Sequence, residues 1–133
     1  MFGIAVGCQK KSMTLEFVVP TGFSGVLKLR ASSTGGVELA ATNGSISLVF
    51  PASGALDVKG TLPTLEWHKP VARFADGTSI PIPGPAAPVP DDAVALRGLG
   101  IKNNNTESWY LVGKADQMQD AMNKFYGFEV PKR

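Results

Sequence analysis

One pair of side chains in this sequence has the types and spacing needed for acid–base or nucleophilic catalysis. His68 is the only histidine, and Glu66 precedes it by two residues in the segment LEWHK, residues 65–69. On a β-strand, residues two apart share a face, so the Glu66 carboxylate could orient the His68 imidazole as a general base. The same pattern is typical of a solvated strand face, and the sequence contains no Gly-x-Ser-x-Gly nucleophile motif. We therefore expect no catalytic residue and no enzymatic activity, with a small hydrolase that uses Glu66 and His68 as an alternative.

The only cysteine, Cys8, could carry a covalent lipid. It follows an apolar run of small residues that ends at Gly7, and Gln9, Lys10 and Lys11 come directly after it. The tetrapeptide AVGC, residues 5–8, resembles the lipobox of bacterial lipoproteins, although Ala5 stands where leucine is commonest. The resemblance implies a diacylglycerol on the Cys8 sulfur, loss of the residues before it, and a protein held by this lipid at a membrane of the bacterial cell envelope.

Residues 1–11 form an apolar N-terminal segment that allows two interpretations. A secretory signal needs a basic region and about 7–15 apolar residues before its cleavage site, whereas seven uncharged residues precede Cys8. Either Met1 lies inside a longer lipoprotein signal whose start is upstream, or the segment is an apolar first strand in which Cys8 is a small buried hydrophobe. The first interpretation predicts a lipid-anchored envelope protein, and the second a cytoplasmic one.

Aromatic and amide side chains provide the candidate binding residues. Trp and Tyr dominate recognition hot spots because they combine a large apolar ring with a polar atom. Trp109 and Tyr110 are neighbours on one expected strand, so they point to opposite faces, and we expect one tryptophan to fill the core. An exposed site is predicted near Trp109 or Tyr110, for an unknown protein or a saccharide. Its other candidate residues are Asn103, Asn104, Asn105, Trp67 and His68.

The composition excludes several kinds of partner and cofactor. The net charge is +2, from 13 basic and 11 acidic residues without a basic cluster in the interior of the chain, which predicts no binding to nucleic acid. One cysteine cannot form an intramolecular disulfide, and one histidine with one cysteine leaves few ligands for a transition metal. Asp91 and Asp92 could contribute to a calcium site, but adjacent carboxylates after a proline-rich loop also suit a solvated turn. We expect no metal and no cofactor.

Alternation of apolar and polar residues predicts a mostly β fold. Hydrophobic residues make up 44% of the 133 residues, enough for one domain with a core. A period of two, typical of half-buried strands, repeats along the first two thirds of the chain, as in Met13, Leu15, Phe17 and Val19. Asn-Gly at 43–44 and Asp-Gly at 76–77 predict tight hairpins, and residues 102–107 a wide hairpin loop. These patterns predict an antiparallel β-sandwich of seven to nine short strands.

The last part of the chain predicts a loop and a helix. Five of the ten prolines lie in residues 81–92, which indicates an extended proline-rich loop. Residues 115–126 predict the only α-helix, because Met118, Ala121, Met122 and Phe125 form an apolar stripe and Gly127 follows. Asp116 is expected to cap this helix, with a glutamine three residues later reaching back. Residues 12–133 are thus expected to form a single β-sandwich domain.

Two segments resemble known proteins. In FVVPTGFSGV, residues 17–26, a strand ends at Pro20, and then Gly22, Phe23 and Gly25 precede the next strand. This order resembles small bacterial envelope lipoproteins of unknown function, and WYLVG, residues 109–113, before the helix is similar to their later part. The proline, glycine and aromatic pattern also resembles transthyretin-like and carboxypeptidase-regulatory-like sandwiches, which are accessory domains. Neither resemblance implies a catalytic residue.

The function expected from the sequence is that of a non-enzymatic, envelope-associated binding or accessory domain, anchored through Cys8. The alternative of another class is a structural or assembly subunit, for example of a virion or an appendage, with the apolar N-terminus as an interface strand.

Overall fold

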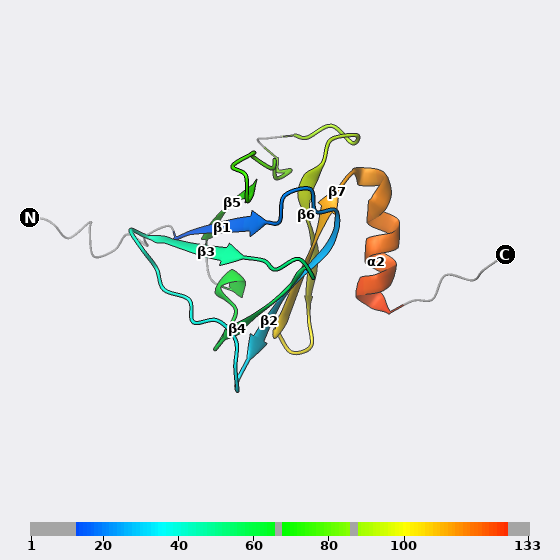
Figure 1. Ribbon diagram of the computed structural model, residues 1–133. Coiled ribbons are helices and arrows are strands. Elements are labelled where there is room, and N and C mark those ends of the chain that lie inside the picture. The colour runs from blue at the N-terminus through cyan, green and yellow to red at the C-terminus, as the bar shows by residue number, and fades with distance from the viewer. Residues whose placement is uncertain (1–12, 66–67, 86–87, 128–133) are drawn as a thin grey trace, which may run out of the picture.

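The computed structural model describes residues 13–65, 68–85 and 88–127, and Figure 1 shows its strands with the C-terminal helix beside them. Cys8, Glu66 and Trp67 lie outside the described residues. Within the described residues the elements are β1 (Met13–Val19), β2 (Gly25–Ser32), β3 (Ser45–Val49), β4 (Ala55–Lys59), η1 (Pro63–Leu65), β5 (His68–Phe74), β6 (Ala95–Lys102), β7 (Glu107–Gly113), η2 (Ala115–Gln117) and α2 (Met118–Tyr126).

The strands form a three-stranded sheet of order β3-β1-β5 and a four-stranded sheet of order β4-β2-β7-β6. The prediction of a mostly β sandwich with a C-terminal helix is confirmed. The seven strands of the described residues match the lower end of the expected number.

The expectation that the sandwich is antiparallel throughout is wrong. The pairs β1–β3, β1–β5 and β2–β4 are parallel, and only β2–β7 and β6–β7 are antiparallel. Each connection between β1 and β6 takes the chain from one sheet to the other and reverses its direction. Every second strand therefore lies in the same sheet and runs in the same direction. Parallel neighbours therefore arise without long helical crossovers.

This alternation also explains why the expected hairpins are incomplete. Asn43 and Gly44 have φ of 53° and 76°, as a tight turn requires, but only Thr42 pairs antiparallel with Ser45. Upstream, Val37 pairs with Val58 of the other sheet, so the segment before the turn is not a hairpin strand. The Asp76 turn is likewise followed by a single bridge, between Arg73 and Ser79. The wide hairpin of β6 and β7 is confirmed.

The predicted inward faces of the strands form the core between the sheets. Leu15, Phe17 and Val19 of β1 are at most 1% exposed, as are Leu27 and Leu29 of β2. The remaining large side chains that are fully buried come from β3, β4, β7 and the segment after β4: Leu48, Val58, Leu62 and Val112. The period-two pattern therefore identified the buried face of these strands.

The helix α2 packs on the outer face of the four-stranded sheet, away from the three-stranded sheet (Figure 1). The predicted stripe faces this sheet, because Ala121 and Phe125 are buried and Met118 and Met122 pack beside them. Gly127, with φ of 76°, ends the helix as expected. The expected cap by Asp116 is wrong. The main-chain N–H of Lys114 donates to the side-chain Oε1 of Gln117 at 2.8 Å, so the capping glutamine lies two positions before the predicted one. Among the described residues, no helix has the length and apolar character needed to cross a membrane.

Candidate functional site

A hollow of about 430 Å³ lies at the edge of the sandwich where β2 and β4 end. Because β2 and β4 are parallel neighbours, their carboxyl-terminal ends meet at the same edge of the sheet. The β6–β7 loop reaches this edge as well, since the Ala31 N–H donates to the Thr106 carbonyl at 2.8 Å. We call this feature the asparagine hollow; its lining residues are Ala31, Ser32, Ser33, Gly60, Thr61, Leu65, Asn104, Asn105 and Thr106.

The loop that forms one wall of the hollow has an unusual backbone. Asn103, Asn104 and Asn105 have φ of 58°, 57° and 63°, so three consecutive residues are left-handed. Asparagine tolerates this conformation better than most residues with a Cβ. The Thr106 hydroxyl donates to the Asn103 carbonyl at 2.6 Å and closes the turn. This backbone places Asn104 and Asn105, both exposed, at the hollow.

A carboxylate at the start of β7 connects this loop to the sheet. Glu107 accepts one hydrogen bond from Asn103 Nδ2 at 2.6 Å and another from the indole Nε1 of Trp109 at 2.9 Å. Partial burial acts to raise the pKa of Glu107. The hydrogen bonds from Trp109 and Asn103, together with the charges of Arg30 and Lys102, outweigh it, so the pKa lies below its ordinary value. Glu107 is therefore ionised at neutral pH and holds the first asparagine in place.

Trp109 is not an exposed binding platform. It lies on the outer face of the sheet, is 7% exposed, and packs edge-on against Phe125 of α2 with ring centroids 5.5 Å apart. The ammonium groups of Lys28 and Lys102 lie 4.4 and 4.9 Å from its ring centroid. The Trp109 ring, which we expected to be exposed, is therefore covered, because the apolar stripe of α2 packs against it. Trp109 also does not fill the space between the sheets.

Tyr110 occupies the opposite face of β7, toward the sandwich core. Its ring packs edge-on against Phe17 at 4.9 Å between centroids, and its hydroxyl accepts a hydrogen bond from Ser108 at 2.8 Å. Burial raises the pKa of the Tyr110 hydroxyl, although the hydrogen bond with Ser108 opposes this. Trp109 and Tyr110 therefore point to opposite faces as predicted, and both rings are packed against other side chains of the protein.

His68, another predicted binding residue, lies in the three-stranded sheet. His68 begins β5, in register with Met13 of β1, and is half-buried. It is not among the lining residues of the hollow. Trp67 and Glu66, its expected neighbours, lie outside the described residues, as does Cys8.

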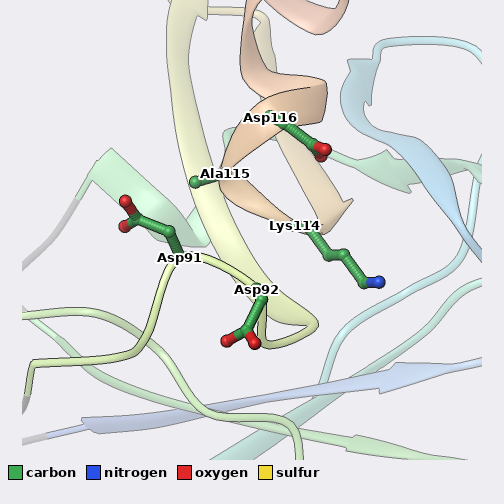
Figure 2. A pocket seen from close by; sticks show the side chains of 5 residues that line it. All are labelled: Asp91, Asp92, Lys114, Ala115 and Asp116. Carbon is green, nitrogen blue, oxygen red and sulfur yellow. The ribbon is translucent and has the colours of Figure 1, made fainter.

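Asp91 and Asp92 line a second hollow, together with Lys114, Ala115 and Asp116. Figure 2 shows the three carboxylates pointing in different directions from one another. Among the described residues, no group of three or more His, Cys, Asp or Glu side chains could hold a metal ion. The contact here is made by main chain: the Ala115 N–H donates to the Asp91 carbonyl at 2.9 Å and ties the proline-rich loop to the start of the helical segment.

Several residues of the asparagine hollow were not predicted from the sequence. Ser32 and Ser33 lie where β2 ends, Thr61 and Leu65 follow β4, and each looks like an ordinary surface residue. Only the parallel pairing of β2 and β4 brings these two segments together, and no local signal predicts that pairing. The asparagine run was the one signal in the sequence that pointed to this edge.

No protein-family model matches the chain, and no curated protein matches its sequence. Among solved structures, the chain is similar to a candidate lipoprotein from Bacillus anthracis, with a TM-score of 0.49 and 14% sequence identity. The similarity covers 92% of this chain and 84% of that one.

Proposed function

We propose that this chain is a non-enzymatic accessory domain of a bacterial cell envelope, anchored through a lipid on Cys8, that binds a saccharide in the asparagine hollow. One observation carries the anchor: the only cysteine directly follows Ala5, Val6 and Gly7, the small and apolar residues that resemble a lipobox. Cys8 would then be the first residue of the mature protein. Stable anchoring needs more than one acyl chain, because a single chain binds a bilayer only marginally.

The short spacer between Cys8 and the sandwich supports a role at the membrane surface. β1 begins at Met13, five residues after Cys8. Even a fully extended spacer of this length spans only about 18 Å. A lipid on Cys8 would therefore keep the domain close to the bilayer, within reach of other envelope components.

The lining of the hollow supports a neutral, hydroxyl-rich ligand. Among the lining residues that the structure describes, none carries a charge, and the polar groups are the amides of Asn104 and Asn105 with the hydroxyls of serine and threonine. Amides and hydroxyls both donate and accept, which matches sugar hydroxyl groups. Leu65, 44% exposed, adds an apolar surface for a methyl group. An N-acetylated sugar offers this combination of hydroxyls, an amide and a methyl.

His68, the candidate catalytic base, does not belong to the proposed saccharide site, so it is not placed to act on a sugar bound there. His68 lies in register with Met13 in the three-stranded sheet, and it does not line the asparagine hollow. The purified protein is expected not to hydrolyse p-nitrophenyl acetate above background. Hydrolysis that disappears in His68→Ala would show that the chain is an enzyme.

Binding at the hollow can be tested with a soluble N-acetylglucosamine oligomer followed by NMR. The side-chain amide signals of Asn104 and Asn105 should shift with added sugar. Asn104→Gly and Asn105→Gly keep the left-handed backbone but remove the amides, so each should weaken binding by about tenfold. Asn43→Gly is the matched control, because Asn43 is also left-handed and lies at another turn. Equal binding by all three variants, or no shifts in the wild type, would contradict the saccharide site.

The anchor can be tested by phase partition in detergent. The gene is expressed with its own upstream DNA in a bacterium that processes lipoproteins, beside a Cys8→Ser variant. The wild type should enter the detergent phase and the variant should stay in the aqueous phase. If both stay in the aqueous phase and form concentration-dependent oligomers in sedimentation, the assembly-subunit alternative is favoured.

A further inference from the structure

Each sheet of the sandwich has two edge strands, and an edge strand presents unpaired main-chain N–H and C=O groups. The edge strands are β3 and β5 in one sheet and β4 and β6 in the other. The edge of β4 is covered by Val37, whose N–H donates to the Asp57 carbonyl at 2.8 Å. The Val37 carbonyl in turn accepts from the Lys59 N–H at 2.9 Å. An additional strand is therefore blocked at β4.

The edges of β5 and β6 are protected by other means. The return segment after the Asp76 turn covers β5, where the Ile80 N–H donates to the Ala72 carbonyl at 2.9 Å. Pro70 in the same strand has no N–H to offer. In β6, a bulge between Gly98 and Gly100 interrupts the regular edge.

β3 is different, because part of its outer edge is open. The Phe50 N–H donates to the Val18 carbonyl, and the Gly44 carbonyl accepts from the Thr14 N–H. The main-chain groups of the even-numbered residues along this strand therefore face β1. The odd positions face outward: Ser45 pairs with Thr42 in both directions, at 2.8 and 3.0 Å. The main-chain groups of Ser47 and Val49 face the same way, and no hydrogen bond joins them to any other residue that the structure describes.

The open edge adjoins a hollow of about 380 Å³. One wall is β3 and the other is the segment before the Asn43 turn, which converges on β3 at Thr42 (Figure 1). The lining residues are Val37, Glu38, Leu39, Ala40, Thr42, Ser45 and Ser47. Unlike natural edges that carry lysine or proline, the strand SISLV has neither.

We propose that the outer edge of β3 binds an extended peptide segment of a partner protein, which adds to the three-stranded sheet as a fourth strand. Such strand addition uses main-chain hydrogen bonds for affinity and alternate side chains for specificity. A single extended peptide can reach the outer edge of β3 even though residues 37–42 form the opposite wall of the hollow. A second copy of this chain would bring its own segment 37–42 to the same place, which disfavours pairing between two β3 strands.

The neighbouring side chains indicate the chemistry of the peptide. On the outer face, Val49 is 60% exposed and would lie beside an apolar or β-branched residue of the added strand. The Glu38 carboxylate in the facing wall lies 3.9 Å from Lys59 Nζ, and its side chain is 81% exposed, which leaves room for a second basic group from the peptide. We infer a peptide with alternating apolar and polar residues, at least one Lys or Arg, and no proline at the paired positions. This proposal is independent of the saccharide site.

The test uses linear peptides selected from a random displayed library on the wild-type protein. Ser47→Pro removes the outward N–H and is tolerated on an edge strand, since that N–H is not used in the ladder with β1. Ser47→Ala is the control, because both variants lose the hydroxyl that donates to Glu16 at 3.1 Å. Selected peptides should bind wild type and Ser47→Ala alike, and Ser47→Pro about tenfold more weakly.

Two further readouts separate main-chain pairing from other binding. Methylation of peptide amides should weaken binding only at every second position, and the amide protons of Ser47 and Val49 should exchange more slowly when peptide is bound. Peptides that bind Ser47→Pro equally well, or a library that yields no peptide dependent on position 47, would overturn the proposal. A dimer of the wild-type chain in sedimentation that Ser47→Pro abolishes would also overturn it, in favour of self-pairing.

Discussion

Trp109 donates its indole N–H to the carboxylate of Glu107 at 2.9 Å, from two residues further along the same strand. Both side chains therefore lie on the face of the sheet that α2 covers in part. The second carboxylate oxygen accepts from Asn103 at 2.6 Å. One carboxylate thus links the packed cluster under the helix to the loop that forms the asparagine hollow.

Glu107→Gln should lower the free energy of unfolding by about 1 kcal/mol at neutral pH. The glutamine side chain has one acceptor oxygen, whereas the carboxylate offers one oxygen to Asn103 and the other to Trp109. Urea denaturation measures this difference. Glu38→Gln is the matched control: it makes the same change at a side chain that is 81% exposed, where the ion pair with Lys59 contributes little. An equal effect of both variants would mean that charge alone, not the two hydrogen bonds, explains the loss.

The Glu107 contribution should depend on pH. Its pKa in the folded protein is lower than its ordinary value of 4.5, so the stabilisation is complete above that value. It is lost as the pH falls through the folded-state pKa. Wild type and Glu107→Gln should therefore converge in stability in acid. A difference that persists unchanged at the lowest pH of the folded protein would contradict the assignment.

Asn104 should tolerate glycine but not a β-branched residue. Its φ of 57° is accessible to glycine without cost, whereas valine at such a position is strained. Asn104→Gly should leave the unfolding free energy within about 0.5 kcal/mol of wild type, and Asn104→Val should lower it by about 1 to 3 kcal/mol. Thermal unfolding of both variants tests this. Equal stability of the two would show that the loop does not hold a left-handed backbone.

Gly100 should be needed for the packing of the helix. A Cβ at this position would lie 2.9 Å from Phe125 Cζ, and the φ of 149° disfavours any other residue. Gly100→Ala should therefore destabilise the protein by about 1 to 3 kcal/mol. Gly98, on the same strand, has open space around its Cβ position and serves as the control. Denaturation curves for Gly98→Ala and Gly100→Ala that coincide would contradict this packing.

Tyr110 should make the protein sensitive to alkaline pH. Its pKa in the folded state lies above the ordinary value of 10.0, because burial disfavours the phenolate. The stability linked to this group is therefore present below pH 10.0 and is lost as the pH rises through the folded-state pKa. Tyr110→Phe should remove this alkaline loss, measured as unfolding free energy against pH. It should also cost about 1 to 3 kcal/mol at neutral pH, since Ser108 loses its buried acceptor.

The sequence predicted which residues are buried better than which strands are neighbours. The alternation in β1 identified Leu15 and Phe17 as core residues, and the helical stripe identified Ala121 and Phe125. Strand pairing could not be predicted, because β1 is hydrogen-bonded to strands far along the chain, as in the pairing of Glu16 with Ser47. Turn residues such as Asn43 and Gly44 specify that the chain reverses, but not which sheet it enters.

The candidate site was predictable only in part, for the same reason. The run Asn103, Asn104 and Asn105 carries a local backbone signal, since asparagine tolerates positive φ. Leu65 and Thr61 reach the hollow only through the parallel pairing of β2 and β4. The burial of Trp109 did have a signal: a helix with an apolar stripe must cover an apolar surface, and the outer face of β7 offers one.

Mass spectrometry of the N-terminal peptide, from protein made with its own upstream DNA, tests the proposed envelope anchor most directly. We predict that the mature chain begins at Cys8 and that this residue carries a diacylglycerol and its acyl chains. A mature chain that still contains residues 1–7, with an unmodified thiol on Cys8, would contradict a lipid-anchored function.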